Sequence, residues 1–288
     1  MTNSRSVILN ESQRQPATCE VGAVRKALEI LCQFTAETPS LSVSDLSRRL
    51  KMPKSTAHNL LRTLGGYDFL KQDPGDRRYR LGPRLYELGL RFSHGTRMVS
   101  VALPHLRRLA DLTKETVKLG VLSGHEVLIL AAIESPYQLH TRGDEGLRAP
   151  LHCTGLGKAM LARLPDQEVR EIVSGRGLPR FTPHTISTVA GLKKELERIR
   201  AAGYTVDLEE HELGVVCVAV SLADTAAGTL AALSVSAPTS RLSGERIAEC
   251  ARQVRQAARA IEDALNRPGG GAPGTAAGPP RPANWEME

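Results

Sequence analysis

Residues Ser42–Gly82 read SVSDLSRRLKMPKSTAHNLLRTLGGYDFLKQDPGDRRYRLG, and this stretch decides the fold of the first part of the chain. Its opening segment, Ser42–Leu50, starts with polar residues and continues with apolar residues at helical spacing. A second helix is expected over Pro53–Leu64, because proline favours the first turn of a helix and the apolar residues that follow share one face. Two short helices joined by a tight turn predict a helix-turn-helix unit.

A β-hairpin is expected after the second helix. The pair Gly65 and Gly66 is interpreted as the break that ends this helix. Two short runs with apolar residues then flank the turn Asp73–Asp76, whose Pro-Gly centre favours chain reversal. Helix, turn, helix and hairpin in this order predict a winged helix-turn-helix.

Positive charge is concentrated on the same stretch. Residues Ser42–Arg91 contain 11 Lys and Arg against 5 Asp and Glu, an excess of six, while the whole chain carries +7. A local basic surface is what neutralisation of DNA phosphates requires. A solvated helix face is the alternative, but the turn, the wing and the charge together favour double-stranded DNA. The predicted DNA-binding residues are Lys54, Ser55, Thr56, His58, Asn59, Arg62, Arg77 and Arg78.

The segment LSVSDLSRRLKMPKSTAHNLLRTL, followed by RRYRLG, resembles the N-terminal domain of the IclR family of bacterial transcriptional regulators. The resemblance continues downstream and covers roughly Val21–Leu265. It implies a regulator, expected to be a repressor, that binds an operator as a homodimer or homotetramer. Asn59 departs from the family, which often has Arg there. Because Asn can pair with adenine, this departure bears on the operator sequence rather than on DNA binding itself.

The chain is expected to form two domains. It is placed in the α+β class because the expected strands stand at both ends of the second domain with helices between them, which favours a central, largely antiparallel sheet. Residues 21–82 are the predicted winged helix-turn-helix, 83–98 a linker helix, and 99–266 an effector-binding domain. The resemblance implies that this second domain is GAF-like, with a largely antiparallel sheet flanked by helices. Residues 1–20 lack periodicity and 267–288 are rich in Gly, Pro and Ala, so both are predicted to be disordered tails.

Periodicity predicts the individual elements. In the first domain, Val21–Thr35 is expected to be a helix that packs through Val24, Leu28, Leu31 and Cys32. In the second domain, Val101–Thr113 is expected to turn Leu103, Leu106, Leu109, Ala110 and Leu112 inward. The remaining expected helices are Pro83–His94, Leu156–Leu164, Asp166–Val173, Gly191–Ala202 and Arg246–Leu265. The expected strands are Thr116–Leu122, Val127–Ile133, Tyr137–Arg142, Tyr204–Leu208, Val215–Leu222 and Thr229–Ser236.

Three segments of the second domain resemble the effector-binding part of the IclR family. They are LHCTGLGKAMLA from Leu151, GVVCVAV from Gly214 and GTLAALSVSAP from Gly228. Position by position, the resemblance implies that a small organic acid is bound by Gly155, Leu156, Asp207, Cys217, Ser234 and Ser236. Aromatic, glyoxylate-like and sugar-derived acids all fit this expectation.

The residues themselves support a polar site at this place. The N–H groups at the start of a helix favour a carboxylate, and glycines let a ligand approach. Ser234 and Ser236 are two apart on a strand, so both point to one face and need partners if buried. Hydrogen bonds to the backbone are the alternative explanation for the two serines. Among the histidines, His152 is interpreted as a loop residue that lies either near the site or in solvent, and His211 as a surface residue.

Two other functions are compatible with parts of this sequence. An enzyme could use Cys153 or Cys217 as a nucleophile with a histidine base, but no nucleophile motif is visible and a basic winged helix would be unexplained. A DNA-binding protein whose second domain only forms oligomers is the other alternative.

The five cysteines form no Cys-x-x-Cys pair, so neither a metal nor a disulfide framework is indicated, and no cofactor is expected. A cytoplasmic protein with no membrane contact is expected, because neither a transmembrane run nor a signal-peptide core is present.

Overall fold

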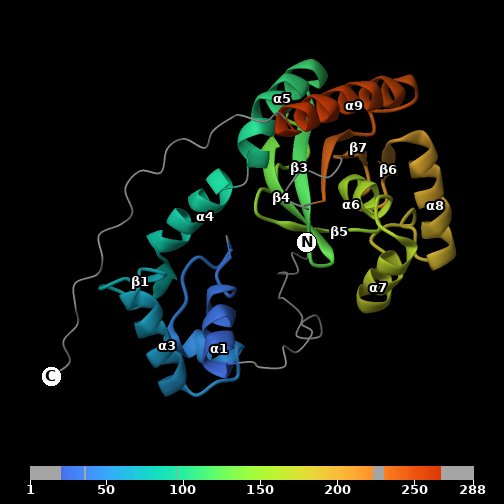
Figure 1. The fold of residues 1–288 in the computed structure, drawn as a ribbon. Helices are drawn as coiled ribbons and strands as arrows, with labels where there is room; N and C mark the ends of the chain where they lie inside the picture. Colours follow the sequence, from blue (N-terminus) through green and yellow to red (C-terminus); the bar gives the residue numbers. More distant parts are fainter. Residues whose placement is uncertain (1–20, 36, 96, 223–229, 267–288) are drawn as a thin grey trace. The chain divides into compact units, whose positions relative to one another are not determined.

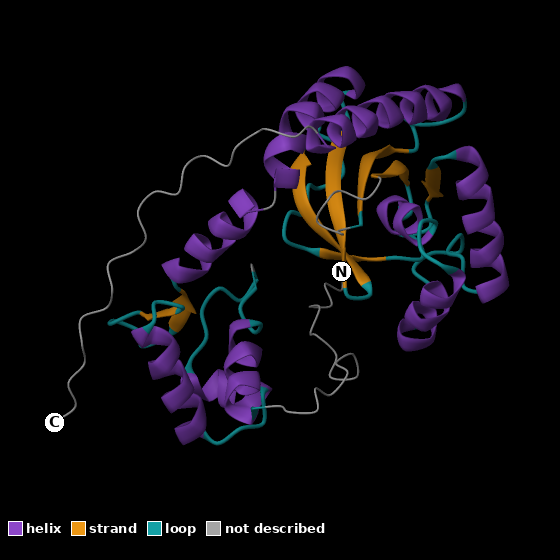
Figure 2. Ribbon diagram, in the orientation of Figure 1, coloured by secondary structure: helices purple, strands orange, loops and turns teal. Residues whose placement is uncertain are grey.

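The computed structural model describes residues 21–35, 37–95, 97–222 and 230–266. These residues form two compact units. One takes in the described chain up to Ser100 together with Pro165–Pro179, and the other takes in Val101–Leu164 and the described chain from Arg180 onward. Figure 1 shows the elements of each unit, and Figure 2 shows the same view coloured by secondary structure. The two predicted tails, 1–20 and 267–288, lie outside the described residues.

Three helices and a two-stranded wing form the main part of the first unit, which confirms the predicted winged helix-turn-helix. The elements are α1 (Gly22–Leu31), α2 (Val43–Arg49), α3 (Lys54–Gly66), β1 (Leu70–Gln72) and β2 (Tyr79–Leu81). The two strands pair antiparallel. Their shared core is closed by residues at most 3% exposed: Ile30, Leu41, Leu46, Ala57, Leu61, Leu70 and Tyr79.

A capping box starts helix α2. The Asp45 N–H donates to Ser42 Oγ, and the Ser42 N–H donates to Asp45 Oδ2, both at 3.1 Å. Each side chain thereby satisfies a backbone donor that has no intrahelical acceptor. The sequence Ser-x-x-Asp carries this signal, which fixes where α2 begins.

The predicted break at Gly65 and Gly66 is wrong, because both residues belong to α3. The chain reverses instead at Asp68, which has a positive φ of 60°. The Asp68 N–H donates to the Gly65 carbonyl at 3.1 Å and the Phe69 N–H donates to the Leu64 carbonyl at 2.9 Å. This pair of bonds closes a helix end, and here it lies beyond the glycines.

The predicted buried face of α1 is wrong in part: Leu31 packs against the core as expected, but the other three predicted residues, Cys32 among them, are exposed. Val24 and Leu28 are 55% and 51% exposed, whereas Ile30 and Phe34 enter the core. Both pairs have a spacing of four residues, so periodicity alone could not choose between them. Helix α4 (Pro83–Gly95) forms as expected, and it too carries exposed apolar side chains, among them Tyr86 and Phe92.

Six strands of the second unit form one antiparallel sheet in the order β5-β4-β3-β8-β7-β6, as far as the described residues go. This confirms the predicted α+β class. The strands are β3 (Thr116–Ser123), β4 (Glu126–Ile133), β5 (Arg148–Pro150), β6 (Thr205–Leu208), β7 (Val215–Leu222) and β8 (Ala231–Pro238). The helices of this unit are most of α5 (Arg97–Thr113), α6 (Gly155–Leu161), α8 (Val189–Ala202) and α9 (Glu245–Asn266), whereas α7 (Asp166–Arg176) belongs to the first unit.

Two predictions in this part fail. Tyr137–Arg142 is a loop rather than a strand, because side chains satisfy its backbone: Arg241 donates to the Leu139 carbonyl (2.8 Å) and Thr116 donates to the Thr141 carbonyl (2.8 Å). The short strand β5 follows it instead. Leu112 is 61% exposed, because it lies about 200° around α5 from the buried Ala110.

The two faces of the sheet have different characters. Along β7, Val216, Val218 and Val220 are buried on one face, while Cys217 and Ala219 point to the other. Helix α9 packs on β7 and β8, and α6 packs on the face that carries Cys217 and Ala219. Gly155 makes this approach possible, since a Cβ there would lie 3.1 Å from the Cβ of Cys217.

Replacing Ser42 with Ala should destabilise the winged helix-turn-helix by about 1 kcal/mol, because α2 loses its N-cap. Urea unfolding followed by circular dichroism would measure this as a lower midpoint for the transition of the first unit. Ser44→Ala is the matched control, since Ser44 is exposed one residue inside the same helix. Equal midpoints for the two variants would contradict the capping role.

Candidate functional site

Helix α3 presents the predicted DNA-binding side chains to solvent. Its inner face is fixed by Ala57 and Leu61, both fully buried against the core of the first unit. The opposite face is polar, which matches the expected arrangement. Lys54, Ser55, His58, Asn59 and Arg62 are exposed, and Thr56 is half-buried.

The two wing arginines differ from each other. Arg77 is exposed, whereas the Arg78 guanidinium donates to Ser40 Oγ (3.2 Å), the Ser40 carbonyl (3.1 Å) and Asp45 Oδ2 (3.1 Å). Hydrogen bonds from Ser42, aided by the charge of Arg78, hold the pKa of Asp45 below its usual value. Arg78 therefore ties the wing to the start of α2, and Arg77 is the wing arginine whose side chain is accessible.

The strand register brings the predicted effector residues together in the second unit. Asp207 on β6 pairs with Cys217 on β7, Cys217 pairs with Ser236 on β8, and Ser236 pairs with Thr116 on β3. Directly paired residues point to the same face, so this row lines the face covered by α6. Ser234 lies on the next row of the same face.

The start of α6 lies against this row. Thr154 caps the helix, since the Gly157 N–H donates to Thr154 Oγ at 3.0 Å, and Gly155 packs on Cys217. A Cβ on Gly157 would lie 2.4 Å from the Leu151 carbonyl oxygen. The glycines therefore serve close packing of the chain against itself, in addition to the ligand approach that the sequence suggested.

Asp207 is buried, at 3% exposure, and its Oδ1 accepts the Glu210 N–H at 2.8 Å. Burial raises the pKa of Asp207 to about 7, although backbone hydrogen bonds and the charge of Lys158 act in the opposite direction. Its charge near neutral pH is therefore set by small changes in its surroundings.

The cysteines of the site are held as thiols. Burial and the nearby Asp207 raise the pKa of Cys217 to about 12, and its Sγ lies 2.9 Å from Ser236 Oγ. Burial also raises the pKa of Cys153. Because the thiolate is the reactive form, neither cysteine suits a nucleophile.

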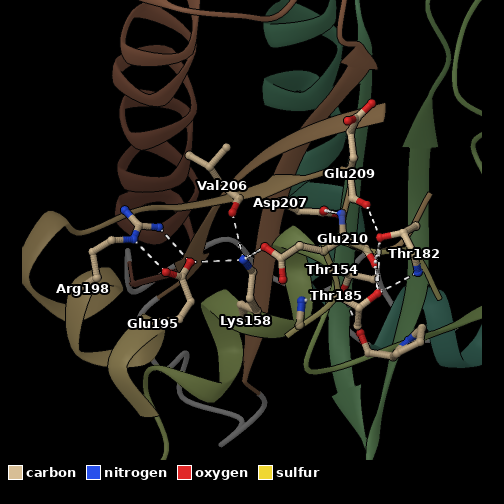
Figure 3. Close-up of polar contacts among 12 residues, drawn as sticks. Thr154, Lys158, Thr182, Thr185, Glu195, Arg198, Val206, Asp207, Glu209 and Glu210 are labelled. Atoms are coloured by element: carbon tan, nitrogen blue, oxygen red, sulfur yellow. Dashed lines mark hydrogen bonds and ion pairs between the residues drawn. The ribbon is translucent and has the colours of Figure 1, made fainter. Parts of the chain in front are cut away.

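A buried lysine anchors α6, and the sequence interpretation missed it. Lys158 is fully buried, and its Nζ donates to Glu195 Oε1 on α8 (3.1 Å), to the Val206 carbonyl on β6 (2.9 Å) and to the Glu210 carboxylate (Figure 3). Arg198 holds Glu195 through two hydrogen bonds. A lysine within the apolar run GLGKAMLA was the available signal, since a buried amine needs carboxylate partners.

Two threonines fix the turn that follows Asp207. Thr182 Oγ1 donates to the Glu209 carbonyl and Thr185 Oγ1 donates to the Glu210 carbonyl, each at 2.6 Å (Figure 3). The turn that presents Glu210 to Lys158 is thus held from two sides. The same turn fixes the position of the Asp207 carboxyl group, because the Glu210 N–H is its hydrogen-bond donor.

Three rings lie close to one another in the second unit. His152 is 5% exposed and lies 6.1 Å from Phe181, whose ring lies 5.1 Å from that of His211. His211 is half-buried rather than on the surface as expected, and burial lowers its pKa.

Within residues 21–35, 37–95, 97–222 and 230–266, no three His, Cys, Asp or Glu side chains are placed to hold a metal ion. None of the helices described is sufficiently long and apolar to cross a membrane.

The sequence matches two family descriptions. Residues 23–74 match "IclR helix-turn-helix domain", and residues 91–263 match "Bacterial transcriptional regulator IclR C-terminal". The chain is similar to the HTH-type transcriptional repressor AllR of Escherichia coli strain K12, at 37% identity over 84% of this chain and 90% of that protein. The AllR of Klebsiella pneumoniae is 36% identical over 84% of this chain and 89% of its own length.

Two solved structures of IclR proteins are similar to this chain. An IclR homolog from Microbacterium hydrocarbonoxydans, complexed with 4-hydroxybenzoate, superposes with a TM-score of 0.76 at 29% identity and covers 84% of this chain and 98% of that one. The Thermotoga maritima IclR superposes with a TM-score of 0.68 at 31% identity and covers 85% and 98% of the two chains.

Replacing Asp207 with Asn should change how stability depends on pH. The folded-state pKa of about 7 lies above the ordinary value of 3.8, so the unfolded chain ionises first as pH rises. The free energy of unfolding of the wild type should therefore contain a term that falls between about pH 4 and pH 7, by at most about 1.4 kcal/mol per pH unit. The Asn variant keeps the acceptor for Glu210 and lacks this term.

Thermal melts of both proteins from pH 5 to pH 8 would measure the difference. The melting temperature of the variant should rise relative to that of the wild type as pH increases. Glu197→Gln, an exposed carboxyl on α8, is the control and should follow the wild-type profile. Parallel profiles for wild type and Asp207→Asn would show that the aspartate ionises as in the unfolded chain.

Proposed function

Because the chain belongs to the IclR family of bacterial transcriptional regulators, we propose that it is a repressor whose affinity for its operator changes when a small organic acid binds to the second unit. The name of the E. coli relative supports repression. The structure with 4-hydroxybenzoate supports an acid as the effector, since that relative was crystallised with one. The observation that carries the proposal is the buried row of Asp207, Cys217 and Ser236 beneath the start of α6.

DNA recognition is assigned to the exposed face of α3. Ser55 and Asn59 carry short polar groups suited to base edges, whereas Lys54, Arg62 and Arg77 suit phosphates. Lys54 lies at the first turn, and His58 and Arg62 follow at four-residue intervals. The half-buried Thr56 lies at the other edge of this face, next to Asn59. Arg78 contributes indirectly, by holding the wing on α2.

Effector binding is assigned to Gly155, Leu156, Asp207, Cys217, Ser234 and Ser236. Ser234 and Ser236 are 2% and 3% exposed, and Thr205, on the same row as Ser234, has a buried hydroxyl with no partner among the described residues. Buried polar groups are normally paired, so these hydroxyls favour a polar ligand over an apolar one. The raised pKa of Asp207 removes an objection to a carboxylate, because a protonated Asp207 does not repel it.

Association into a homodimer or homotetramer is part of the proposal. Apolar side chains on α1 and α4 are exposed in the single chain, including Val24, Leu28, Tyr86 and Phe92. Contiguous exposed apolar residues mark interaction surfaces. We place the functional regions at 21–82 for DNA binding, 83–98 for the linker and 99–266 for the effector, in a cytoplasmic protein.

Asn59→Ala should weaken binding to the preferred duplex by about tenfold or more and leave binding to random DNA unchanged, because it removes a base contact. Arg77→Gln should weaken both and reduce the slope of log affinity against log salt by about 0.9, since one phosphate contact is lost. Fluorescence anisotropy on a duplex selected from a random library, and on a scrambled duplex, would measure both. Equal losses on the two duplexes for Asn59→Ala would place the base contacts elsewhere.

Replacing both Ser234 and Ser236 with Ala should lower the affinity for the effector at least tenfold, because two hydrogen bonds to a charged group are lost. Folding and operator binding should persist. Isothermal titration with organic acids, 4-hydroxybenzoate included, would measure affinity, and anisotropy would follow the operator. Ser243→Ala, an exposed serine before α9, is the control. Wild-type affinity in the double variant would refute the proposed location.

A further inference from the structure

Two lysines reach the face of the sheet that α6 covers, and their surroundings differ sharply. Lys158 is fully buried and gives its three N–H donors to Glu195, Glu210 and the Val206 carbonyl. Lys118 donates to Asp144 Oδ2 at 3.2 Å, the one acceptor found for its ammonium among the described residues. An ammonium has three donors, so Lys118 retains hydrogen-bonding capacity that Lys158 has used up.

The register places Lys118 beside the proposed effector residues. It lies on β3 directly opposite Ser234 on β8, and Ser234 lies opposite Ala219 on β7. Its side chain therefore leaves the same face as Ser234 and Ser236. The Lys118 side chain is 14% exposed, so its charge is largely shielded from bulk water.

The charge of Lys118 is felt inside the site. Burial raises the pKa of the Cys217 thiol, and Lys118 is one of the groups that act against this rise. Burial lowers the pKa of His211, and Lys118 adds to that effect. Cys217 is a member of the row Asp207–Cys217–Ser236, so the charge of the Lys118 ammonium reaches this row.

The partner of Lys118 is presented by a firmly held loop. The Gly143 N–H donates to Glu134 Oε1 at 2.8 Å, and the Ala132 N–H donates to Glu145 Oε1 at 2.7 Å. Between them, Asp144 has a positive φ of 59° and a side chain that is 36% exposed. Water can hydrate this carboxylate if another anion takes its place on Lys118.

The site is thus polarised across the sheet. The acid Asp207 lies on β6 and the cation Lys118 lies on β3, with β7, β8 and their hydroxyls between them. We propose that Lys118 is the residue that recognises the carboxylate of the effector, exchanging Asp144 for the ligand, while the Asp207 end receives a hydroxyl or other donor of the same ligand. This inference rests on the proposed function and specifies the effector as an acid that also carries a hydrogen-bond donor.

The test compares acids with their neutral amides on the full-length protein. The probes are 4-hydroxybenzoate, benzoate, glycolate and lactate, each paired with the corresponding amide, in thermal-shift and isothermal titration measurements. The wild type should prefer at least one acid over its amide by about tenfold or more, because charge-assisted hydrogen bonds are the stronger ones. Lys118→Met should abolish that preference, and Lys118→Arg should keep most of it.

Asp144→Asn separates recognition from a purely structural ion pair. If Lys118 binds the ligand, removing its competitor should tighten acid binding several-fold, by about three- to tenfold. If the pair only braces the loop, Asp144→Asn and Lys118→Met should both weaken binding. Melts without added acid show whether each variant folds, and Asp144→Asn decides the question even where Lys118→Met does not fold.

The outcomes are distinguishable. Loss of binding in the Ser234→Ala, Ser236→Ala double variant with full binding in Lys118→Met would leave the proposed function standing and overturn the role of Lys118. Unchanged or weaker acid binding in Asp144→Asn would also overturn it. A wild type that prefers none of the four acids over its amide would overturn both the inference and the proposed acid effector.

Discussion

The second unit depends on the burial of one positive charge. Lys158 is fully buried, and an unpaired ammonium at that depth would be strongly unfavourable, so Glu195, Glu210 and the Val206 carbonyl must converge on it. These acceptors come from α8, from β6 and from the turn after β6. A single side chain therefore holds α6 in register with three other segments, which is why the start of α6 meets Cys217 and Ala219 so closely.

The hydrogen bonding and the pKa of Asp207 depend on the same arrangement. The turn that brings Glu210 to Lys158 also supplies the N–H that Asp207 accepts, and Thr182 and Thr185 hold this turn through its carbonyls. Burial then raises the pKa of Asp207, while Lys158 limits the rise. The acidity of the site is thus a property of the framework around it, since the groups that set it belong to the anchor of α6.

Much of this architecture could be predicted from the sequence. The apolar run Val215–Leu222 and the helical spacing of Pro53–Leu64 identify β7 and α3. A short strand covered on both faces is apolar throughout, whereas a helix buried on one face repeats its apolar residues every three or four positions. What escaped prediction depends on contacts between distant residues. Nothing local shows that Arg241 and Thr116 satisfy the loop taken for a strand, or that Ile30 rather than Val24 enters the core. Lys118 was missed because only the sheet register places it opposite Ser234, and Phe181 was missed because its ring contacts with His152 and His211 join residues far apart in the chain.

The absence of a Cβ at Gly157 has an evolutionary consequence. The Leu151 carbonyl oxygen occupies the space that any larger residue would need, and Lys158 beside it has no freedom of its own. Substitutions at these two positions disturb the whole scaffold, whereas Phe181 at the margin is 48% exposed and can vary without touching it. Sequence change is therefore tolerated at Phe181 and resisted at Gly157 and Lys158, so that variation of the surface and persistence of the fold fall on different residues.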